Sequence, residues 1–158
     1  MPPALIVDPA SLDLSTVVHD RAAVEARIPQ RFEMAFLDRV HLVDPGRGIC
    51  VGSRDIRADE FWVAGHVPGR PLLPGVLAVE ALAQTCTFYY ALVTPEDGRF
   101  MGFGAVDGVK FRGTIVPGDR LVLATRALEI RSRRCVFDAQ AMVGDRLVVE
   151  ARITGMPV

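Results

Sequence analysis

Apolar and polar residues along this chain follow two spacings, one typical of strands and one typical of a long buried helix. Short runs rich in Val, Ile, Leu and Phe, separated by turn residues, predict strands. These runs cover residues 36–43, 48–56, 99–105, 108–116, 120–130, 134–143 and 146–153. Turn signals separate several of them, namely DPGR between the first two runs and a Gly-Asp pair before the fifth and the last. The pattern therefore predicts six or seven strands with short connections.

The stretch 74–93 predicts one long helix that is apolar on nearly every side. Pro74 suits the first helical position, because its missing N–H would be unpaired there in any case. Between Arg70 and Glu96 the only formally charged side chain is Glu80. A helix of this kind is either buried in protein or inserted in a membrane. Since it carries polar residues and no other such span occurs in the sequence, we favour burial in protein.

Strands joined by short turns around one long helix indicate an α+β fold, in which an antiparallel sheet curls around the helix. The length of 158 residues suits a single domain with a real apolar core. Residues 11–28 have a looser helical spacing that ends at Pro29. We therefore expect a lead-in helix or extension over residues 1–27, followed by one domain over residues 28–158.

The charge and cysteine content of the chain indicate in which cellular compartment it works and which classes of partner it can bind. The chain has 18 basic and 19 acidic residues, so its net charge gives no global reason to bind nucleic acid or an anionic membrane. Cys50, Cys86 and Cys135 are odd in number and widely spaced, which argues against a disulfide framework and a cysteine metal site. The sequence does not open on a basic region followed by an apolar stretch, so we expect no secretory signal. A reducing cytoplasm fits these features.

The candidate chemistry lies on the loop that leads into the long helix and on the helix itself. Residues 65–75 contain three prolines and three glycines, which predicts a rigid loop that carries His66. Glu80 has no charged neighbour one helical turn away, so burial favours its protonated form. An imidazole beside such a carboxyl can work as a general base and acid pair. Taken singly, each residue can also be structural, bonded to backbone or water.

Two further groups would complete this site. Gly75 lacks a side chain and lies in the first turn of the helix, where backbone amides are unpaired and can donate to a developing oxyanion. Gln84 lies four residues after Glu80 on the same helical face, where it can hydrogen-bond the carboxyl. The predicted arrangement suits stabilisation of an enolate.

The residues around this site resemble a known family signature. The stretch GHVPGRPLLPGVL at 65–77, followed by EALAQ at 80–84, resembles that of the β-hydroxyacyl-acyl carrier protein dehydratases of bacterial type II fatty acid synthesis. The segments IPQRF, KFR and VPGD resemble flanking parts of that family, so the resemblance covers about residues 28 to 154. It implies a hotdog fold and a homodimer with acyl tunnels at the subunit interface. A trimer of dimers, a hexamer, is the larger alternative.

By position, the resemblance implies that His66 is the catalytic base, Glu80 the catalytic acid and Gly75 the amide that binds the thioester carbonyl. In the family, the histidine and the acid of one site come from different subunits. The implied reaction eliminates water from a 3-hydroxyacyl chain carried by acyl carrier protein and gives the trans-2-enoyl thioester. The thioester already acidifies the α-carbon, so we expect neither a metal nor another cofactor. Related dehydratase-isomerases have aspartate at the Glu80 position, which favours a plain dehydratase.

The sequence departs from the family pattern near both parts of the site. Val67 replaces the usual phenylalanine after the histidine, and Gln30, Phe32 and Glu33 occupy positions where histidine, tyrosine and proline are common. These departures leave the acyl chain length open. Two other functions also stay open at this point, a hotdog acyl thioesterase and a noncatalytic acyl-binding module of the same fold.

Arg131, Arg133 and Arg134 form the densest basic cluster of the chain. The cluster is either a solvated turn between two strands or a docking patch for the acidic carrier protein. The two remaining histidines, His19 and His41, are far apart in sequence and are expected at the surface, so we expect no zinc site.

Two further patterns favour structure over ligand binding. The glycines of 102–108 miss the GxGxxG spacing, which argues against nucleotide binding. The aromatic residues 88–90 are expected in the core or at a dimer contact.

Overall fold

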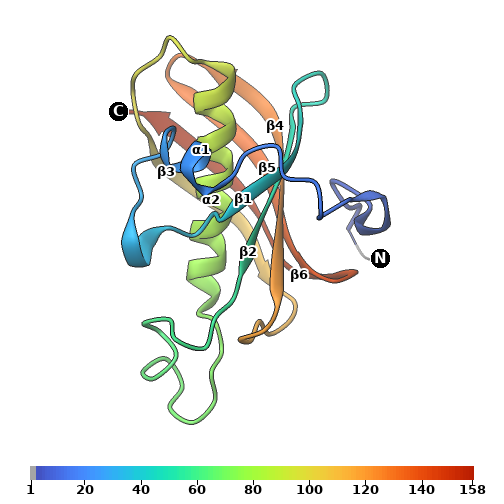
Figure 1. The fold of residues 1–158 in the computed structure, drawn as a ribbon. Helices are drawn as coiled ribbons and strands as arrows, with labels where there is room; N and C mark the ends of the chain where they lie inside the picture. The colour runs from blue at the N-terminus through green and yellow to red at the C-terminus, as the bar shows by residue number, and fades with distance from the viewer. Residues whose placement is uncertain (1–2) are drawn as a thin grey trace.

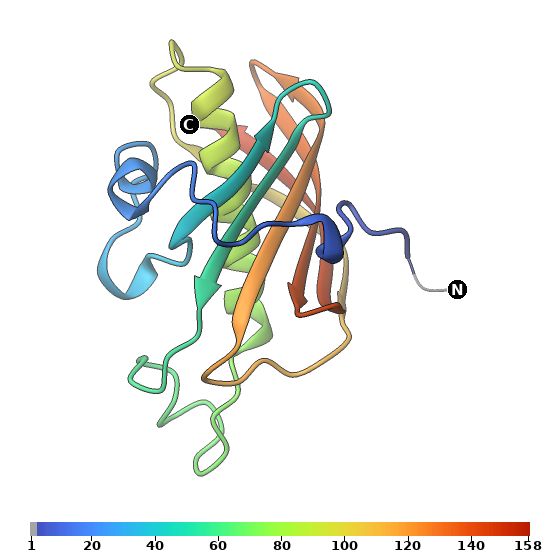
Figure 2. The ribbon, with the colours of Figure 1, turned by 45° about the vertical axis from the view of Figure 1, so that its right-hand side comes forward.

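The computed structural model describes residues 3–158 and shows a six-stranded antiparallel sheet that wraps around helix α2 (Gly75–Val93) (Figures 1 and 2). The strands lie in the order β1-β2-β4-β5-β6-β3. Their bounds are β1 (Arg39–Asp44), β2 (Ile49–Asp55), β3 (Met101–Phe111), β4 (Arg120–Arg131), β5 (Arg134–Val143) and β6 (Arg146–Pro157). The expected α+β architecture, with the sheet curled around one long helix, is confirmed.

Two hairpins form where the sequence places its turn signals. The last pair between strands β1 and β2 before their turn is Asp44 with Ile49. Within the turn, the Arg47 N–H donates to the Asp44 carbonyl at 3.2 Å. Strands β5 and β6 pair up to Val143 opposite Arg146, so only two residues form their turn. Gly144 has a φ of +60° there, a conformation that tight hairpin turns require and that glycine adopts without steric cost.

Helix α2 forms the core together with the concave face of the sheet. Most of its residues are buried, and the aromatic residues 88–90 are at most 3% exposed, which confirms the expected core position. By length and composition α2 would suffice to cross a membrane, yet 61% of its most apolar window is buried inside the protein. That burial is typical of the core helix that we expected from the sequence.

Strand β3 differs from the expectation of two separate strands over 99–105 and 108–116. It is one edge strand whose pairing with β6 is irregular between Phe103 and Ala105 and again between Asp107 and Lys110. Gly108, with a φ of +58°, lies in the second irregularity. A glycine in a strand often marks such a bulge rather than the end of the strand, which explains the difference.

Of the two forms expected for residues 1–27, a lead-in helix or an extension, the described residues 3–27 are mostly an extension. Only α1 (Arg21–Glu25) is α-helical, and the Asp20 side chain caps it by accepting from the Ala23 N–H. Two short 3-10 turns, η1 (Pro9–Ser11) and η2 (Phe32–Met34), flank the region. Leu12 and Leu14 pack on the outer face of the sheet, whereas Val17 and Val18 are exposed, so the segment has no continuous apolar helical stripe.

Residues 4–14 cross the outer, convex face of the sheet, and we call them the N-terminal strap (Figure 2). Two hydrogen bonds hold the strap to Gln140 of β5, from the Ile6 N–H at 2.8 Å and to the Ala4 carbonyl at 3.0 Å. Buried and partly buried apolar side chains of the strap and of the sheet form a second core there, made of Ile6, Val7, Leu12, Leu14, Leu42, Ile49, Val51, Val122, Ala124, Met142 and Leu147.

The expected surface position of His41 is also wrong. This side chain is only 5% exposed. Its Nδ1 lies 2.8 Å from the Thr16 carbonyl and its Nε2 lies 2.7 Å from the Ser53 hydroxyl. Because a carbonyl only accepts, Nδ1 carries the hydrogen and Nε2 accepts from Ser53. His41 therefore links the N-terminal segment to β2.

Candidate active site

The loop between β2 and α2 places His66 at the end of the molecule where α2 begins (Figure 1). His66 is exposed, and its Nδ1 lies 2.8 Å from the Leu72 carbonyl of the same loop. That carbonyl can only accept, so Nδ1 carries the hydrogen and Nε2 presents a lone pair. The loop is fixed in turn by the Leu73 N–H, which donates to the Ile115 carbonyl at 2.9 Å. The imidazole is thus oriented with its basic nitrogen free.

Gly75 is the first residue of α2 and lines the same cavity as His66. The volume of this cavity is about 350 Å³. A Cβ atom at position 75 would lie 2.6 Å from the Phe111 ring, so the absence of a side chain keeps the space in front of the amide open. First-turn amides have no partner inside the helix and carry its partial positive charge. They are suited to hold a negative oxygen.

Glu80 lies five residues further along α2, half-buried in a second and smaller cavity of about 130 Å³. Burial raises the pKa of its carboxyl, and the hydrogen bond from Gln84 opposes part of that shift. The Gln84 Nε2 donates to Glu80 Oε1 at 2.8 Å, so the second carboxyl oxygen, Oε2, is the one that can carry a proton. The local environment therefore favours a neutral carboxyl with one available O–H.

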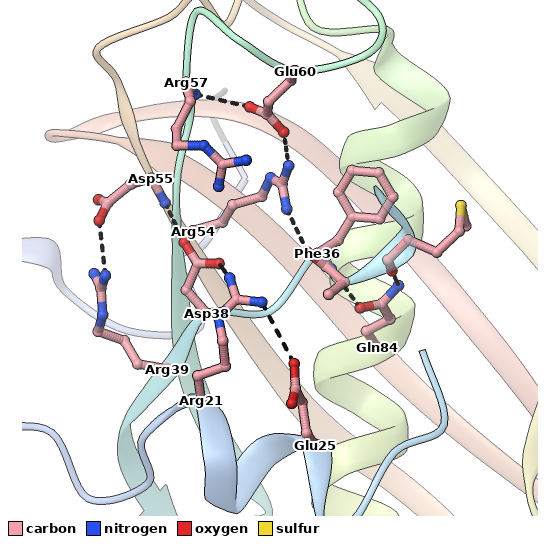
Figure 3. Close-up of polar contacts among 12 residues, drawn as sticks. Arg21, Glu25, Phe36, Asp38, Arg39, Arg54, Asp55, Arg57, Glu60 and Gln84 are labelled. Carbon is pink, nitrogen blue, oxygen red and sulfur yellow. Dashed lines mark hydrogen bonds and ion pairs between the residues drawn. The ribbon is translucent and has the colours of Figure 1, made fainter. Parts of the chain in front are cut away.

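Gln84 is only 1% exposed, and its amide is fully used. Its Oε1 accepts from the Phe36 N–H at 2.8 Å, while Nε2 also donates to the Met34 carbonyl at 2.7 Å. These partners fix the orientation of the amide, because in the reversed orientation the Nε2 donor would face the Phe36 N–H, which is also a donor. Gln84 thus connects the carboxyl of Glu80 to the segment that precedes β1, as Figure 3 shows for Phe36.

Buried Arg54 contacts the same segment, which precedes β1 (Figure 3). Arg54 is 4% exposed, forms an ion pair with buried Glu60 and donates to the Ala35 carbonyl at 2.7 Å. Its guanidinium also lies 4.3 Å from the centre of the Phe36 ring. This network is not predicted from the sequence, because a charged residue in a strand that borders a loop is ordinarily solvated. Only the non-local fold shows that it is buried.

Within one chain the predicted site residues form two separate groups. His66 and Gly75 line one cavity, Glu80 and Gln84 line the other, and the two cavities share no lining residue among residues 3–158. The contact between Gln84 and Glu80 that the sequence suggested is present. A single chain does not bring His66 and Glu80 into one cavity.

The basic cluster lies at the other end of α2, in the turn between β4 and β5. Arg131 and Arg134 both pair with Glu129, at 3.4 Å and 3.3 Å. Arg99, which follows the end of α2, donates to the Ser132 carbonyl of this turn at 2.8 Å. Because a helix of 19 residues is about 28 Å long, most of that length separates the cluster from the loop of His66. The docking role of Arg131, Arg133 and Arg134 stays a prediction.

Among the residues that the structure describes, no group of three or more His, Cys, Asp or Glu side chains is placed to hold a metal ion. The three cysteines are buried and unpaired with one another. Cys50 and Cys86 contact the core rather than either cavity.

Comparisons with known proteins agree with the sequence motifs. Residues 28–152 match the family model described as FabA-like domain. A 3-hydroxyacyl-[acyl-carrier-protein] dehydratase FabZ of Moorella thermoacetica is 36% identical over 134 residues, covering 85% of this chain and 93% of the relative. The FabZ of Anaplasma phagocytophilum is 37% identical over 142 residues, covering 87% and 96%. The solved dehydratase heterocomplex ApeI:P from Xenorhabdus doucetiae superposes with a TM-score of 0.73 at 16% identity, covering 85% of this chain and 90% of that one.

Proposed function

The chain belongs to the FabA-like family of 3-hydroxyacyl-acyl carrier protein dehydratases, and from this premise we propose how its residues carry out the reaction. It is a hydro-lyase with a hotdog fold, which eliminates water from a β-hydroxyacyl thioester in fatty acid biosynthesis. The observation that carries the assignment is the identity of 35–37% to curated dehydratases over most of the chain. The roles of individual residues below are our proposal.

Each of three groups has one task in the elimination. His66 Nε2 removes the proton from the α-carbon, and the Gly75 N–H donates to the thioester oxygen as it becomes negative. Glu80 gives its proton to the departing 3-hydroxyl, so the carbon–oxygen bond breaks, the double bond forms and water leaves. A positioned acid or base contributes about 10²–10⁴-fold, and one oxyanion donor about 10²–10³-fold. Burial raises the pKa of Glu80 and so favours the protonated form that this direction of the reaction requires.

The separation of the two groups in one chain supports a homodimer as the working unit. In the proposed assembly, His66 and Gly75 of one subunit face Glu80 of the other. The edge strand β3 is unpaired on one side within the chain and exposes Phe103 and Phe111, which are 51% and 56% exposed. Val76, in the first turn of α2, is 70% exposed. Apolar side chains beside a free strand edge are suited to cover by a second copy.

We propose acyl carrier protein as the partner that presents the substrate, and the cytoplasm as the compartment. The basic cluster at Arg131, Arg133 and Arg134 is the proposed docking patch, since positive charge would steer an acidic carrier. A trimer of dimers is the larger assembly to be tested by light scattering. The roles proposed for His66 and Glu80 do not depend on the docking patch or on the larger assembly.

One assay separates the dehydratase from the two alternatives that the sequence left open. A 3-hydroxyacyl thioester is incubated with the protein, and the absorbance of the conjugated enoyl thioester and the release of free thiol are followed together. Enoyl product without thiol is the expected result. Thiol release would identify a thioesterase, and saturable binding without either product would identify a noncatalytic acyl-binding module.

Subunit mixing tests the shared site directly. His66→Ala and Glu80→Ala are each expected to lose most turnover while they stay folded. A mixed dimer of the two variants has one site with both lesions and one intact site. Random mixing after unfolding and refolding should therefore restore roughly a quarter of the wild-type activity. If the mixture stays as inactive as its parents, the base and acid come from the same subunit and the proposed arrangement is wrong.

A further inference from the structure

The cavity at Glu80 extends along one face of α2. Its helical lining residues are Glu80, Ala83, Gln84 and Thr87, a spacing of three and four that follows one side of a helix. Glu80 and Thr87 are therefore about 10 Å apart along the axis. In the proposed reaction Glu80 meets the 3-hydroxyl, while the other groups of the site hold the thioester end of the substrate. The carbons beyond the hydroxyl therefore extend along this cavity toward Thr87.

Met101 lies at the Thr87 end of the cavity. A loop over residues 94–100 joins the end of α2 to the start of β3, so Met101, the first residue of β3, lies beside the C-terminal half of the helix (Figure 1). Met101 and Gly155 of β6 both line the cavity. Met101 pairs with Pro157 in the ladder between these strands, so Gly155 is its diagonal neighbour on the same face of the sheet. Met101 belongs to the core that α2 shares with the sheet, so this face is directed toward the helix.

The missing side chain of Gly155 makes room for Met101. A Cβ atom at position 155 would lie 2.5 Å from both Cγ and Sδ of Met101 and 3.0 Å from its Cε. The methionine side chain therefore occupies the space that any other residue at position 155 would need. Methionine is unbranched and can change its conformation, but the close-packed core around it offers little empty space apart from the cavity. The position of this one side chain thus determines how far the cavity extends from Glu80.

We propose that Met101 is a specificity-determining residue, which packs on Gly155 and limits the length of the acyl tail. This inference rests on the proposed dehydratase function and names the substrate class of the same site. The cavity volume of about 130 Å³ is close to that of an engineered apolar cavity of roughly 150 Å³ that holds one benzene molecule. The preferred substrates are therefore 3-hydroxyacyl thioesters with no more than about six carbons beyond the hydroxyl-bearing carbon.

Dehydration of a series of 3-hydroxyacyl thioesters, from butyryl to hexadecanoyl length, tests the proposal. Met101→Ala removes the end wall of the cavity. The ratio of kcat/KM for a chain two carbons longer than the wild-type optimum to kcat/KM for that optimum should rise about 10- to 200-fold, the effect of a methylene group in a hydrophobic pocket. Gly155→Ala displaces Met101 toward Glu80 and should move the optimum to shorter chains, by a similar factor.

Two matched controls repeat these substitutions away from the cavity. Met142→Ala removes a buried methionine from the second core, under the N-terminal strap. Gly104→Ala places a Cβ atom 2.8 Å from Cγ of Met156, which is 50% exposed and can move into solvent. Neither control should change the chain-length profile. The double variant with alanine in place of both Met101 and Gly155 relieves the overlap, so it should fold even where Gly155→Ala does not, and it should accept chains at least as long as the wild-type protein does.

Three outcomes would overturn the proposal. An unchanged chain-length profile in Met101→Ala and in the double variant would show that the tail does not end at Met101. An equal loss of kcat/KM at every chain length would show that Met101 supports the fold without selecting the substrate. A wild-type optimum at hexadecanoyl length would show that the tail is not confined to this cavity. None of these outcomes affects the proposed function, which fails only if the wild-type protein forms no enoyl thioester or if His66→Ala keeps full activity.

Discussion

Replacement of Gln84 by leucine tests whether one amide both supports the acid and holds the segment before β1. Leucine keeps most of the volume and removes all three hydrogen bonds. The Phe36 N–H and the Met34 carbonyl are left without their partner, and each loss costs about 1–3 kcal/mol. The added apolar surface returns roughly 1 kcal/mol of this. We therefore expect Gln84→Leu to lower the free energy of unfolding by about 1–5 kcal/mol.

Urea unfolding at a fixed subunit concentration, together with the rate of enoyl formation, measures the two effects. The matched control is Glu80→Gln, which leaves the bonds of Gln84 to Phe36 and Met34 in place. The control should lose turnover but keep the urea midpoint, whereas Gln84→Leu should lose both. A Gln84→Leu protein with an unchanged midpoint would refute the idea that this amide holds the segment around Phe36.

The pH dependence of the same variant follows from the pKa of Glu80. Burial raises that pKa, so the folded protein binds the proton more tightly than the unfolded chain does. The stability contributed by this proton is complete below the unfolded pKa and is lost as pH rises through the folded pKa. Because Gln84 opposes the shift, Gln84→Leu should raise the pKa further and move the loss of turnover on the alkaline side to higher pH. A shift to lower pH would contradict this account.

Three more changes probe other parts of the molecule. Gly75→Ala should fold but lower kcat by about 10²–10³-fold, because the new methyl group and the displaced Phe111 ring crowd the amide; near-normal kcat would argue against its oxyanion role. Ile6→Asp places a carboxylate between the N-terminal strap and the sheet, so thermal or urea unfolding should show a free energy of unfolding that is lower by about 2–4 kcal/mol. An unchanged value would show that the strap does not stabilise the fold. Replacement of Arg131, Arg133 and Arg134 by glutamate should raise KM for the carrier-bound substrate but leave KM for a small thioester unchanged. An equal rise in both KM values would exclude docking at this cluster.

Local signals in the sequence were sufficient for α2 and for the hairpins, but they failed where the partner of a segment is distant. Pro74 and the uncharged stretch after it predict α2 because both features act within the helix itself. Residues 11–28 have a loosely helical spacing, and only the outer face of the sheet, formed by distant strands, explains why Leu12 and Leu14 lie in an extended strap instead. His41 is buried for the same reason, since Thr16 and Ser53 reach it from two other parts of the chain.

The same limit applies to the site. His66, Glu80 and Gly75 follow from the loop and helix signals, and the bond from Gln84 to Glu80 follows from a spacing of four residues. The other partners of Gln84 lie about 50 positions earlier in the chain, and no local pattern connects them to it. The exposed or buried state of Arg54 and of the Gln30 amide likewise depends on contacts that only the folded chain makes.

The geometry of α2 supports the proposed dimer. Gly75 and Glu80 are five residues apart, which is about 7.5 Å along the axis and about 140° around it. The Gly75 position and the Glu80 side chain therefore lie on different sides of the helix, and they line separate cavities in the single chain. In the proposed dimer, a two-fold axis that places the Gly75 side of one helix opposite the Glu80 side of another makes two identical and complete sites. A helix with both groups on one face would need no partner, so the spacing of five residues is consistent with an activity that depends on the proposed dimer.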